Sequence, residues 1–314
     1  MATLHVVFTT LVLQASWGLA FSSLLGPRTV PKVLDQQIKE NKYCFSCIKI
    51  DNICYNHTYL LEFPAPFAEH YPVVKRMGTM NLTNVLYYTF EPKFSDEEYS
   101  KVAYVSLYYP EFYGVISGWH SHNFGPFDID HKEKKVYLGG SDGIWVVDDT
   151  NYFPKYFMAK TNLITNVVVK DYLYFTAANR NGIFKYRDAT LSFYLMDQKI
   201  HTFVLDDELN IVFVNDTGLF ISFHNINQEE VKLSSERWFK GLTVDMKGTV
   251  YAWHAVNGIN KVSVGNTPSE TTLKRVTGIA PDAMTFDESN NILYSVKKKL
   301  YKLTKVATSK CFGR

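Results

Sequence analysis

The sequence has little net charge, few cysteines and no long apolar run beyond its first residues, and each shortage excludes a class of protein. A balance of 33 Lys+Arg against 31 Asp+Glu leaves +2, too weak a field to indicate a nucleic-acid partner. One Cys-x-x-Cys, at Cys44 and Cys47, has neither a second such motif nor a close His pair to complete a zinc site. We therefore expect no metal, no cofactor and no membrane-spanning segment in the mature chain.

The N-terminus has the features of a secretory signal. Its first twenty residues contain no Lys, Arg, Asp or Glu, and they end in Gly18-Leu19-Ala20, small at both positions that a signal peptidase reads. The apolar part from Val6 to Leu13 is short for a membrane anchor, so we predict a cleaved signal over residues 1–20. Residues 21–43 carry two prolines and no clean period, which favours a mobile leader. The protein is therefore expected outside the cell.

Secretion makes the cysteines candidates for disulfides. Asp51-Asn52 lies between two short apolar runs, which predicts a hairpin in which Cys47 and Cys54 face each other. Cys44 would then remain for Cys311 and join the two ends of the chain. Four cysteines allow three pairings, so this one is a preference among them. The same compartment makes glycosylation expected at three sequons, which begin at Asn56, Asn81 and Asn215.

A strand-forming segment recurs six times from Asn84 onward. The chain is 15% aromatic, and each copy is a short run of β-branched and aromatic residues that follows a turn. The six runs are NVLYY at 84, KVYLG at 135, YLYFT at 172, NIVFV at 210, TVYAW at 249 and NILYS at 291. The longest interval, the first, contains a polar insertion from Glu91 to Lys101. A period near 40 with about four short strands per unit is typical of a β-propeller.

Two turn signals accompany the repeated strand. A glycine that indicates a hairpin follows it in four copies, at Gly143, Gly182, Gly218 and Gly258, with Asn257-Gly258 the strongest of these signals. An aspartate often ends the apolar run before it, at Asp130, Asp206, Asp245 and Asp287. Each aspartate could be a metal ligand or a catalytic acid. Their recurrence at one place in the repeat favours turn residues that accept backbone hydrogen bonds.

We predict an all-β fold, a single six-bladed β-propeller with four-stranded blades over residues 44–314. The second strand of each blade would be covered on both faces by neighbouring blades, which explains why these strands are continuous apolar runs. The ring would be closed by the N- and C-terminal segments, with a strand from the N-terminal region beside the last blade. A Cys44–Cys311 disulfide would stabilise that closure.

Propeller loops between second and third strands, and those that join successive blades, gather around one mouth of the channel, where a site is expected. In this chain they are aromatic and amide-rich, which suits a planar, partly polar organic ligand. Trp119 and Trp253 would stack on it, although packing between blades is an alternative for Trp253. The predicted ligand-binding residues are Trp119, Phe124, Ser141, Asn166, Asn179, Arg180, Trp253 and His254.

The segments VYLGGSDGIWVVD, GLTVDMKGTVYAWHAVNGINKVSV and AMTFDESNNILYS resemble the repeats of insect ommochrome-binding proteins. The resemblance covers the chain from about Cys47 to its C-terminus and includes the early cysteine pair and Cys311. It implies a secreted haemolymph protein that binds a tryptophan-derived pigment or a similar aromatic metabolite. The leader and the insertion at 91–101 depart from the family. More distantly, the chain is similar to propellers of the senescence-marker and gluconolactonase group.

These observations predict a monomeric binding protein whose partner is a small aromatic ligand. The distant resemblance leaves open a metal-dependent lactonase or hydrolase, which would hold a calcium-like ion in the channel through Asp, Glu and Asn oxygens. Asn123, Asn166 and Asn179 could contribute to such a site, but no Glu can be placed at the start of an inner strand. An interaction module that uses the outer rim of the ring is a third alternative.

Overall fold

The computed structural model describes residues 47–50, 53–65, 74–91, 100–116, 123–148, 151–225, 229–265 and 267–306. The chain divides into two compact units, Met1–Tyr43 and Cys44–Arg314. The first unit lies outside the described residues, and so do the predicted signal peptide and leader. Cys44, Trp119 and Cys311 also lie outside them. The fold described below is that of the second unit.

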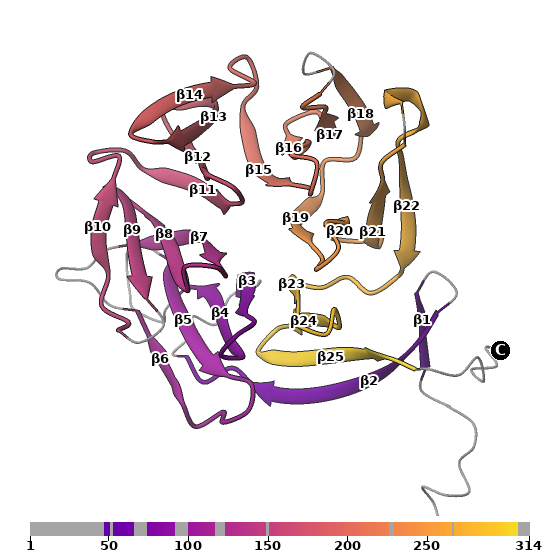
Figure 1. Ribbon diagram of the computed structural model, residues 1–314. Helices are drawn as coiled ribbons and strands as arrows, with labels where there is room; N and C mark the ends of the chain where they lie inside the picture. Colours follow the sequence, from indigo (N-terminus) through magenta and orange to yellow (C-terminus); the bar gives the residue numbers. More distant parts are fainter. Residues whose placement is uncertain are drawn as a thin grey trace, which may run out of the picture. The chain divides into compact units, whose positions relative to one another are not determined.

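The second unit is a ring of six antiparallel sheets, which confirms the six-bladed β-propeller (Figure 1). The first strand of each blade lies nearest the centre of the ring. Blade 1 contains β3 (Val74–Met80), β4 (Val85–Phe90), β5 (Lys101–Ser106) and β6 (Tyr113–Val115). Blade 2 contains β7 (Phe124–Asp130), β8 (Lys135–Gly140), β9 (Gly143–Asp148) and β10 (Lys155–Met158). Blade 3 contains β11 (Ile164–Val169), β12 (Leu173–Ala177), β13 (Arg180–Arg187) and β14 (Thr190–Tyr194).

The remaining blades follow the same order from the centre outwards. Blade 4 contains β15 (Ile200–Leu205), β16 (Ile211–Asn215), β17 (Gly218–Ser222) and β18 (Glu230–Ser234). Blade 5 contains β19 (Phe239–Val244), β20 (Val250–His254), β21 (Gly258–Ser263) and β22 (Thr272–Thr277). Blade 6 contains β23 (Ala283–Phe286), β24 (Ile292–Val296) and β25 (Lys299–Lys305), followed by β2 (Ile53–Glu62) and β1 (Cys47–Ile50). The 3-10 helix η1 (Pro268–Glu270) precedes β22, and no helix in the described part of the chain is long and apolar enough to cross a membrane.

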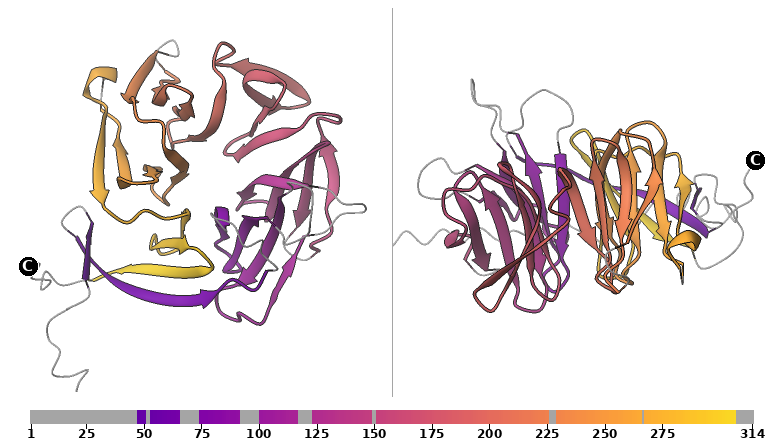
Figure 2. Two further views of the ribbon diagram at one scale, coloured as in Figure 1. Left: turned by 180° about the vertical axis from the view of Figure 1, so that it is seen from behind. Right: turned by 90° about the horizontal axis from the view of Figure 1, so that it is seen from above.

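The predicted closure by an N-terminal strand is confirmed. Strand β2 pairs antiparallel with β25 from Tyr55 opposite Lys305 to Glu62 opposite Lys299, and the two strands run side by side in Figure 2. Blade 6 has five strands instead of the expected four, because β1 pairs in turn with the outer edge of β2.

The two cysteines of the β1–β2 hairpin are not directly opposite each other. Its register places Cys47 opposite Asn56 and Cys54 opposite Lys49. The expectation that Cys47 and Cys54 face each other is therefore wrong by two positions, because only two residues, 51 and 52, separate the strands. Their disulfide, like that between Cys44 and Cys311, stays a prediction.

Apolar clusters join the blades. In the described part of the chain, each of the six interfaces between neighbouring blades has its own buried cluster, including the interface between the last blade and the first. The closing cluster combines Leu61 and Phe63 with Leu293 of β24 and with Leu86 and Tyr88 of β4. Every residue of β4, β12 and β16 is buried, as predicted for second strands. Burial of this apolar surface is the main force that closes the ring.

The repeated aspartates are turn residues, as predicted. Asp206 Oδ1 accepts hydrogen bonds from the backbone amides of Glu208 (2.9 Å) and Asn210 (2.8 Å). Asp245 and Asp287 accept the amides at the same two positions, and Asp130 accepts those two and three residues further on. Each carboxylate thereby fixes the turn between the first and second strands of its blade.

The repeated glycines do not form the centres of hairpin turns, which corrects the prediction made from Asn-Gly. Gly143, Gly218 and Gly258 each begin the third strand, and Gly258 pairs with His254 across a loop of three residues. Their φ angles are positive, at 123°, 143° and 81°. A Cβ on any of them would lie within 2.6 Å of a carbonyl oxygen at the end of the fourth strand. Glycine recurs here because the outer strand approaches so closely.

Candidate functional site

A cavity of about 390 Å³ lies in the central channel and is lined by the first strands of all six blades. Its walls come from the second halves of β3, β7, β11, β15, β19 and β23 and from loops that follow these strands. The cavity therefore lies toward the mouth formed by the loops between first and second strands. A volume near the lower end of the range for ligand sites suits a small molecule.

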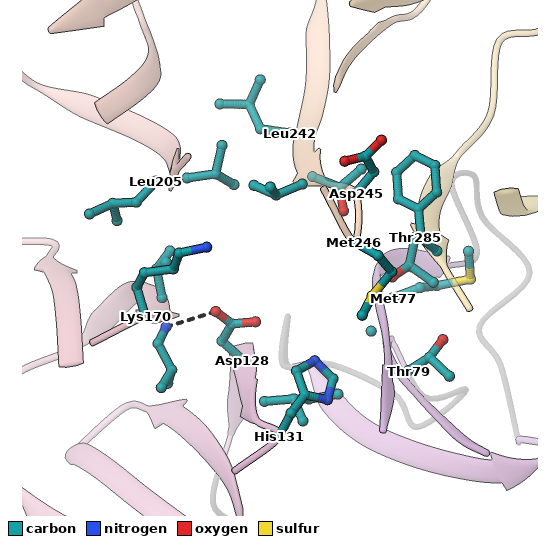
Figure 3. Close-up of a pocket in the computed structure, with 18 of the residues that line it drawn as sticks. Met77, Thr79, Asp128, His131, Lys170, Leu205, Leu242, Asp245, Met246 and Thr285 are labelled. Carbon is teal, nitrogen blue, oxygen red and sulfur yellow. Dashed lines mark hydrogen bonds between the residues drawn. The ribbon is translucent and has the colours of Figure 1, made fainter. Parts of the chain in front are cut away.

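Apolar side chains make up much of the cavity wall. They come from all six blades and include Met77, Phe127, Val168, Leu205, Leu242 and Phe286. Figure 3 shows Leu205 and Leu242 on the side of blades 4 and 5, with Met77 and Met246 across from Lys170. Such a wall can bury the flat or branched body of an organic ligand.

Two opposite charges face the same cavity from blades 1 and 2. Arg76 of β3 donates a hydrogen bond from Nη2 to the Val167 carbonyl (3.0 Å), and its guanidinium lies 5.9 Å from the centre of the Phe127 ring. Asp128 of β7 accepts a hydrogen bond from the Val169 amide at Oδ2 (2.7 Å), drawn as the dashed line in Figure 3. Within the described part of the chain, Arg76 and Asp128 form no ion pair with each other. Their charges are close but not directly bonded.

Burial acts on the pKa values of both groups. It lowers the pKa of the Arg76 guanidinium, and the Asp128 carboxylate acts in the opposite direction. It also raises the pKa of Asp128, against the effects of Arg76 and of the Val169 and Ile129 amides. Both shifts disfavour the charged form, so this part of the channel has a poorly solvating environment. Electrostatic contacts made here by a ligand would be stronger than in water.

The cavity rim carries further charged groups. Lys170 Nζ donates a hydrogen bond to Asp207 Oδ1 (2.5 Å), which links blades 3 and 4. His131 lies beside Asp128 and Asp130; burial lowers its pKa, and the two carboxylates oppose this effect. Asp245 and Met246 face them from blade 5 (Figure 3). The rim therefore carries both positive and negative side chains, and it does not favour a ligand of one charge over the other.

Two polar atoms on the cavity wall are buried without a hydrogen-bond partner among the described residues. They are Thr79 Oγ1 and Asn81 Oδ1. Thr79 is 3% exposed, and the amide nitrogen of Asn81 lies 3.2 Å from Met246 Sδ. An unpaired buried polar group costs about 1–3 kcal/mol, which a ligand that bonds it would offset.

Most of the predicted ligand-binding residues lie at the other end of the channel. Ser141 and Asn179 are exposed on turns between second and third strands, and Arg180 is exposed at the start of β13. Asn166 is buried in β11, where Nδ2 donates hydrogen bonds to Thr176 Oγ1 (3.1 Å) and to the His201 carbonyl (2.8 Å). Phe124 is fully buried in the cluster between blades 1 and 2. These five residues do not line the cavity, and their role in ligand binding stays a prediction.

Trp253 is the one predicted residue, among those described, that lines the cavity. It is 3% exposed and packs between blades 5 and 6, so interblade packing and a ligand contact are compatible. Its Nε1 donates to the Asp282 carbonyl (3.2 Å). Gly241 makes room for the indole ring, because a Cβ there would lie 2.2 Å from Cζ2.

His254, by contrast, stabilises its own loop. Its Nδ1 accepts hydrogen bonds from the amides of Val256 and Asn257 (both 3.1 Å), so the ring proton must lie on Nε2. The Glu236 carboxylate lies 3.3 Å from Nε2, close enough to attract the proton but outside hydrogen-bond geometry. The side chain is 4% exposed and has little surface for a ligand.

The three predicted sequons lie in different surroundings. Asn56 is exposed on β2. Asn81 lines the cavity, and Asn215 is 8% exposed, with Nδ2 donating to Gln198 Oε1 (2.9 Å). Glycosylation at each position stays a prediction.

The described residues do not fit the ion that a lactonase of this fold would hold. Among them, no group of three or more His, Cys, Asp or Glu side chains could bind a metal. At the channel end opposite the cavity, the buried carboxylate of Asp282 bonds Lys240 Nζ (3.1 Å) and the Lys297 amide (2.8 Å). The Lys240 ammonium therefore already neutralises the Asp282 carboxylate, which a metal cation at this end of the channel would need as a ligand.

Arg76, Asp128 and Thr79 are functional candidates that the sequence reasoning missed. Each stands in a first-strand segment, in VKRMGTM or FGPFDID, and resembles an ordinary residue of an amphipathic strand. For Arg76 and Asp128, the available signal was a charged residue within a strand-forming segment, which the wall of a channel can accommodate.

Comparisons with known proteins find similar folds but no family. No protein-family model and no curated protein matches the chain. A gluconolactonase from Xanthomonas campestris has a TM-score of 0.59 at 11% identity, covering 83% of this chain and 97% of its own. Virginiamycin B lyase from Staphylococcus aureus has a TM-score of 0.51 at 10% identity, covering 80% and 100%. The WD40 domain of Neurospora crassa Pan2 has a TM-score of 0.51 at 10% identity, covering 80% and 96%. Such likeness establishes a propeller fold shared with gluconolactonases and lyases, and the fold alone.

Proposed function

We propose that this protein binds a small organic ligand in the channel cavity and acts as a carrier. The observation that carries the proposal is one cavity that combines an apolar wall with Arg76, Asp128 and the unpaired Thr79 hydroxyl. Binding sites for small molecules typically join apolar walls to a few convergent polar groups.

The ligand class in this proposal is an aromatic metabolite of tryptophan, such as an ommochrome pigment or its precursor. The support is the resemblance of the repeats to ommochrome-binding proteins, together with a wall of methionine, leucine and aromatic side chains. Secretion, glycosylation and a monomeric state complete the proposal and rest on the sequence.

Titration of the purified protein with 3-hydroxykynurenine and with xanthommatin tests the proposal. We expect saturable quenching of tryptophan fluorescence with a Kd of about 1 μM, or about −8 kcal/mol. Trp253 lines the cavity, so Trp253→Phe should remove most of the quenching. Trp238 is 73% exposed in the loop before β19, at the opposite mouth, so Trp238→Phe should leave the quenching unchanged.

Calorimetry with both ligands separates loss of signal from loss of binding. No saturable heat or quenching with either ligand would contradict the proposal. Quenching that depends on Trp238 instead of Trp253 would move the site to the opposite mouth, where the sequence placed it.

A metal-dependent lactonase is the enzymatic alternative; the fold shared with gluconolactonases supports it, whereas the described residues offer no cluster of metal ligands. It predicts hydrolysis of glucono-δ-lactone that a chelator abolishes and calcium or zinc restores. Turnover of this kind would favour the enzyme over the carrier.

A further inference from the structure

The cavity presents two opposite charges, Arg76 and Asp128, that bond backbone groups but form no ion pair among the described residues. Arg76 uses one of its five N–H donors, in the hydrogen bond to the Val167 carbonyl, and forms no ion pair among the described residues. The guanidinium fork matches a carboxylate, which it can bind through two parallel hydrogen bonds. A half-buried Arg with unused donors beside a cavity is suited to a planar oxyanion.

The second charge makes a simple anion a poor ligand. Asp128 lies on the neighbouring blade, acts on Arg76 electrostatically and presents its carboxylate to the cavity (Figure 3). Its Oδ2 accepts the Val169 amide, the Ile129 amide also acts on the carboxylate, and no described side chain forms an ion pair with it. A ligand carboxylate bound to Arg76 would be repelled by Asp128 unless the ligand also carried a cation there.

The two unpaired atoms of blade 1 extend this pattern. Thr79 Oγ1 can donate to a carboxylate or accept from an ammonium, whereas Asn81 Oδ1 only accepts. Both follow Arg76 along the chain, at the end of β3 and directly after it, and both line the cavity. A head group with both an acceptor and several N–H donors would satisfy them together.

We propose that the cavity recognises the α-amino-acid head group of its ligand, with the carboxylate on Arg76 and the ammonium on Asp128. The side chain of the ligand then lies against Met77, Phe127, Leu205 and Leu242. Because the head group is zwitterionic, it neutralises both half-buried charges and adds no net charge to the channel. This inference rests on the proposed carrier function and specifies its ligand class.

Three probes that share an indole ring test the assignment by calorimetry. L-Tryptophan carries both charges, tryptamine lacks the carboxylate and indole-3-propionate lacks the ammonium. We expect L-tryptophan to bind about tenfold to hundredfold more tightly than either analogue, as expected when a charged hydrogen bond is lost. Indole-3-propionate should be the weakest, since its carboxylate meets Asp128 without a compensating cation.

Variants assign each charge to its partner. In Arg76→Gln, L-tryptophan should lose its advantage over tryptamine but keep its advantage over indole-3-propionate; in Asp128→Asn, the reverse should hold. The adjacent Arg187 and Asp188, which are 59% and 86% exposed, provide matched controls. Arg187→Gln and Asp188→Asn should leave all three affinities unchanged. Thermal melting verifies that each variant is folded, and the wild-type comparison needs no variant.

Equal binding of all three probes to the wild-type protein would overturn the head-group assignment and leave the carrier proposal intact. Tighter binding of either analogue than of L-tryptophan would also overturn it. If neither these probes nor the pigments bind, both proposals fail.

Discussion

At the scale of single residues, one aspartate illustrates how a repeated turn residue can gain a second role. Asp287 accepts the Ser289 and Asn291 amides, as its counterparts do in other blades. It also pairs with Lys302 Nζ of β25 (2.7 Å), and its side chain is 6% exposed. The turn of the last blade is thereby tied to the strand that receives β2.

This pairing makes stability depend on pH in the acid range. Burial raises the pKa of Asp287, but Lys302 and Asn291 together outweigh it and lower the pKa below the usual 3.8. The ionised form therefore stabilises the fold above pH 4, and the contribution is lost as pH falls through the lowered pKa. Asp287→Asn should cost about 1–3 kcal/mol at pH 7 in urea unfolding, and the difference should shrink as pH falls through the lowered pKa.

Asp130→Asn is the matched control. Asp130 also accepts two backbone amides but forms no ion pair in the described part of the chain. Its substitution should cost less than about 0.5 kcal/mol at pH 7. A deficit for Asp287→Asn that persists unchanged at pH 2 would show that packing, and not charge, causes it.

At the scale of the elements, the edge of each blade is fixed by the close approach of its outer strand. Gly218 is the extreme case, because its φ is 143° and a Cβ would lie 1.9 Å from the Ser234 carbonyl oxygen of β18. The outer strand can pair with β17 in this register only if the third strand begins with glycine.

Gly218→Ala should therefore destabilise the protein by about 2–4 kcal/mol, because it combines a strained φ with a backbone clash. The measurement is the free energy of unfolding in urea. Gly125→Ala provides the comparison, since the nearest atom to its Cβ is 4.0 Å away, and it should change stability by less than about 1 kcal/mol. Equal effects of the two substitutions would refute this account of the blade edge.

The elements could be predicted from sequence better than the cavity. All six second strands were found, because strands covered on both faces are continuous apolar runs. The cavity depends on Arg76, Asp128 and Thr79 from two blades, and no spacing within one blade reveals that they converge. Trp253 was found because an indole in a repeat stands out, whereas a charge in an alternating strand does not.

At the scale of the whole molecule, stability depends on joining the first described strands to the last. Strand β2 supplies Leu61 to the cluster between blades 6 and 1, beside Leu300 of β25. The six clusters support one another only when this interface is made. Closure is therefore the step at which the propeller becomes a single cooperative unit.

A covalent link across the closing strands should raise stability measurably. Asn56 and Thr304 are both exposed and lie opposite each other in the β2–β25 ladder, at a separation suited to a disulfide. The double substitution Asn56→Cys with Thr304→Cys should add about 2–4 kcal/mol when oxidised. Differential scanning calorimetry before and after reduction measures the gain.

The single substitutions serve as controls, and Asn56→Cys alone also reports the effect of losing that sequon. Identical melting temperatures for the oxidised and reduced double variant would mean that closure does not limit stability.

The β2–β25 pairing also determines the order of events during synthesis on the ribosome. His57 and Tyr294, joined by a hydrogen bond of 2.8 Å in the finished ring, are 237 residues apart in the chain. Blades 1 to 5 can pair locally as they emerge, since each is built from consecutive strands. Strand β2 must wait for β25, with its inner edge unpaired throughout translation. A product terminated before Lys299 would carry five formed blades and an open strand, and we expect such fragments to aggregate or be degraded.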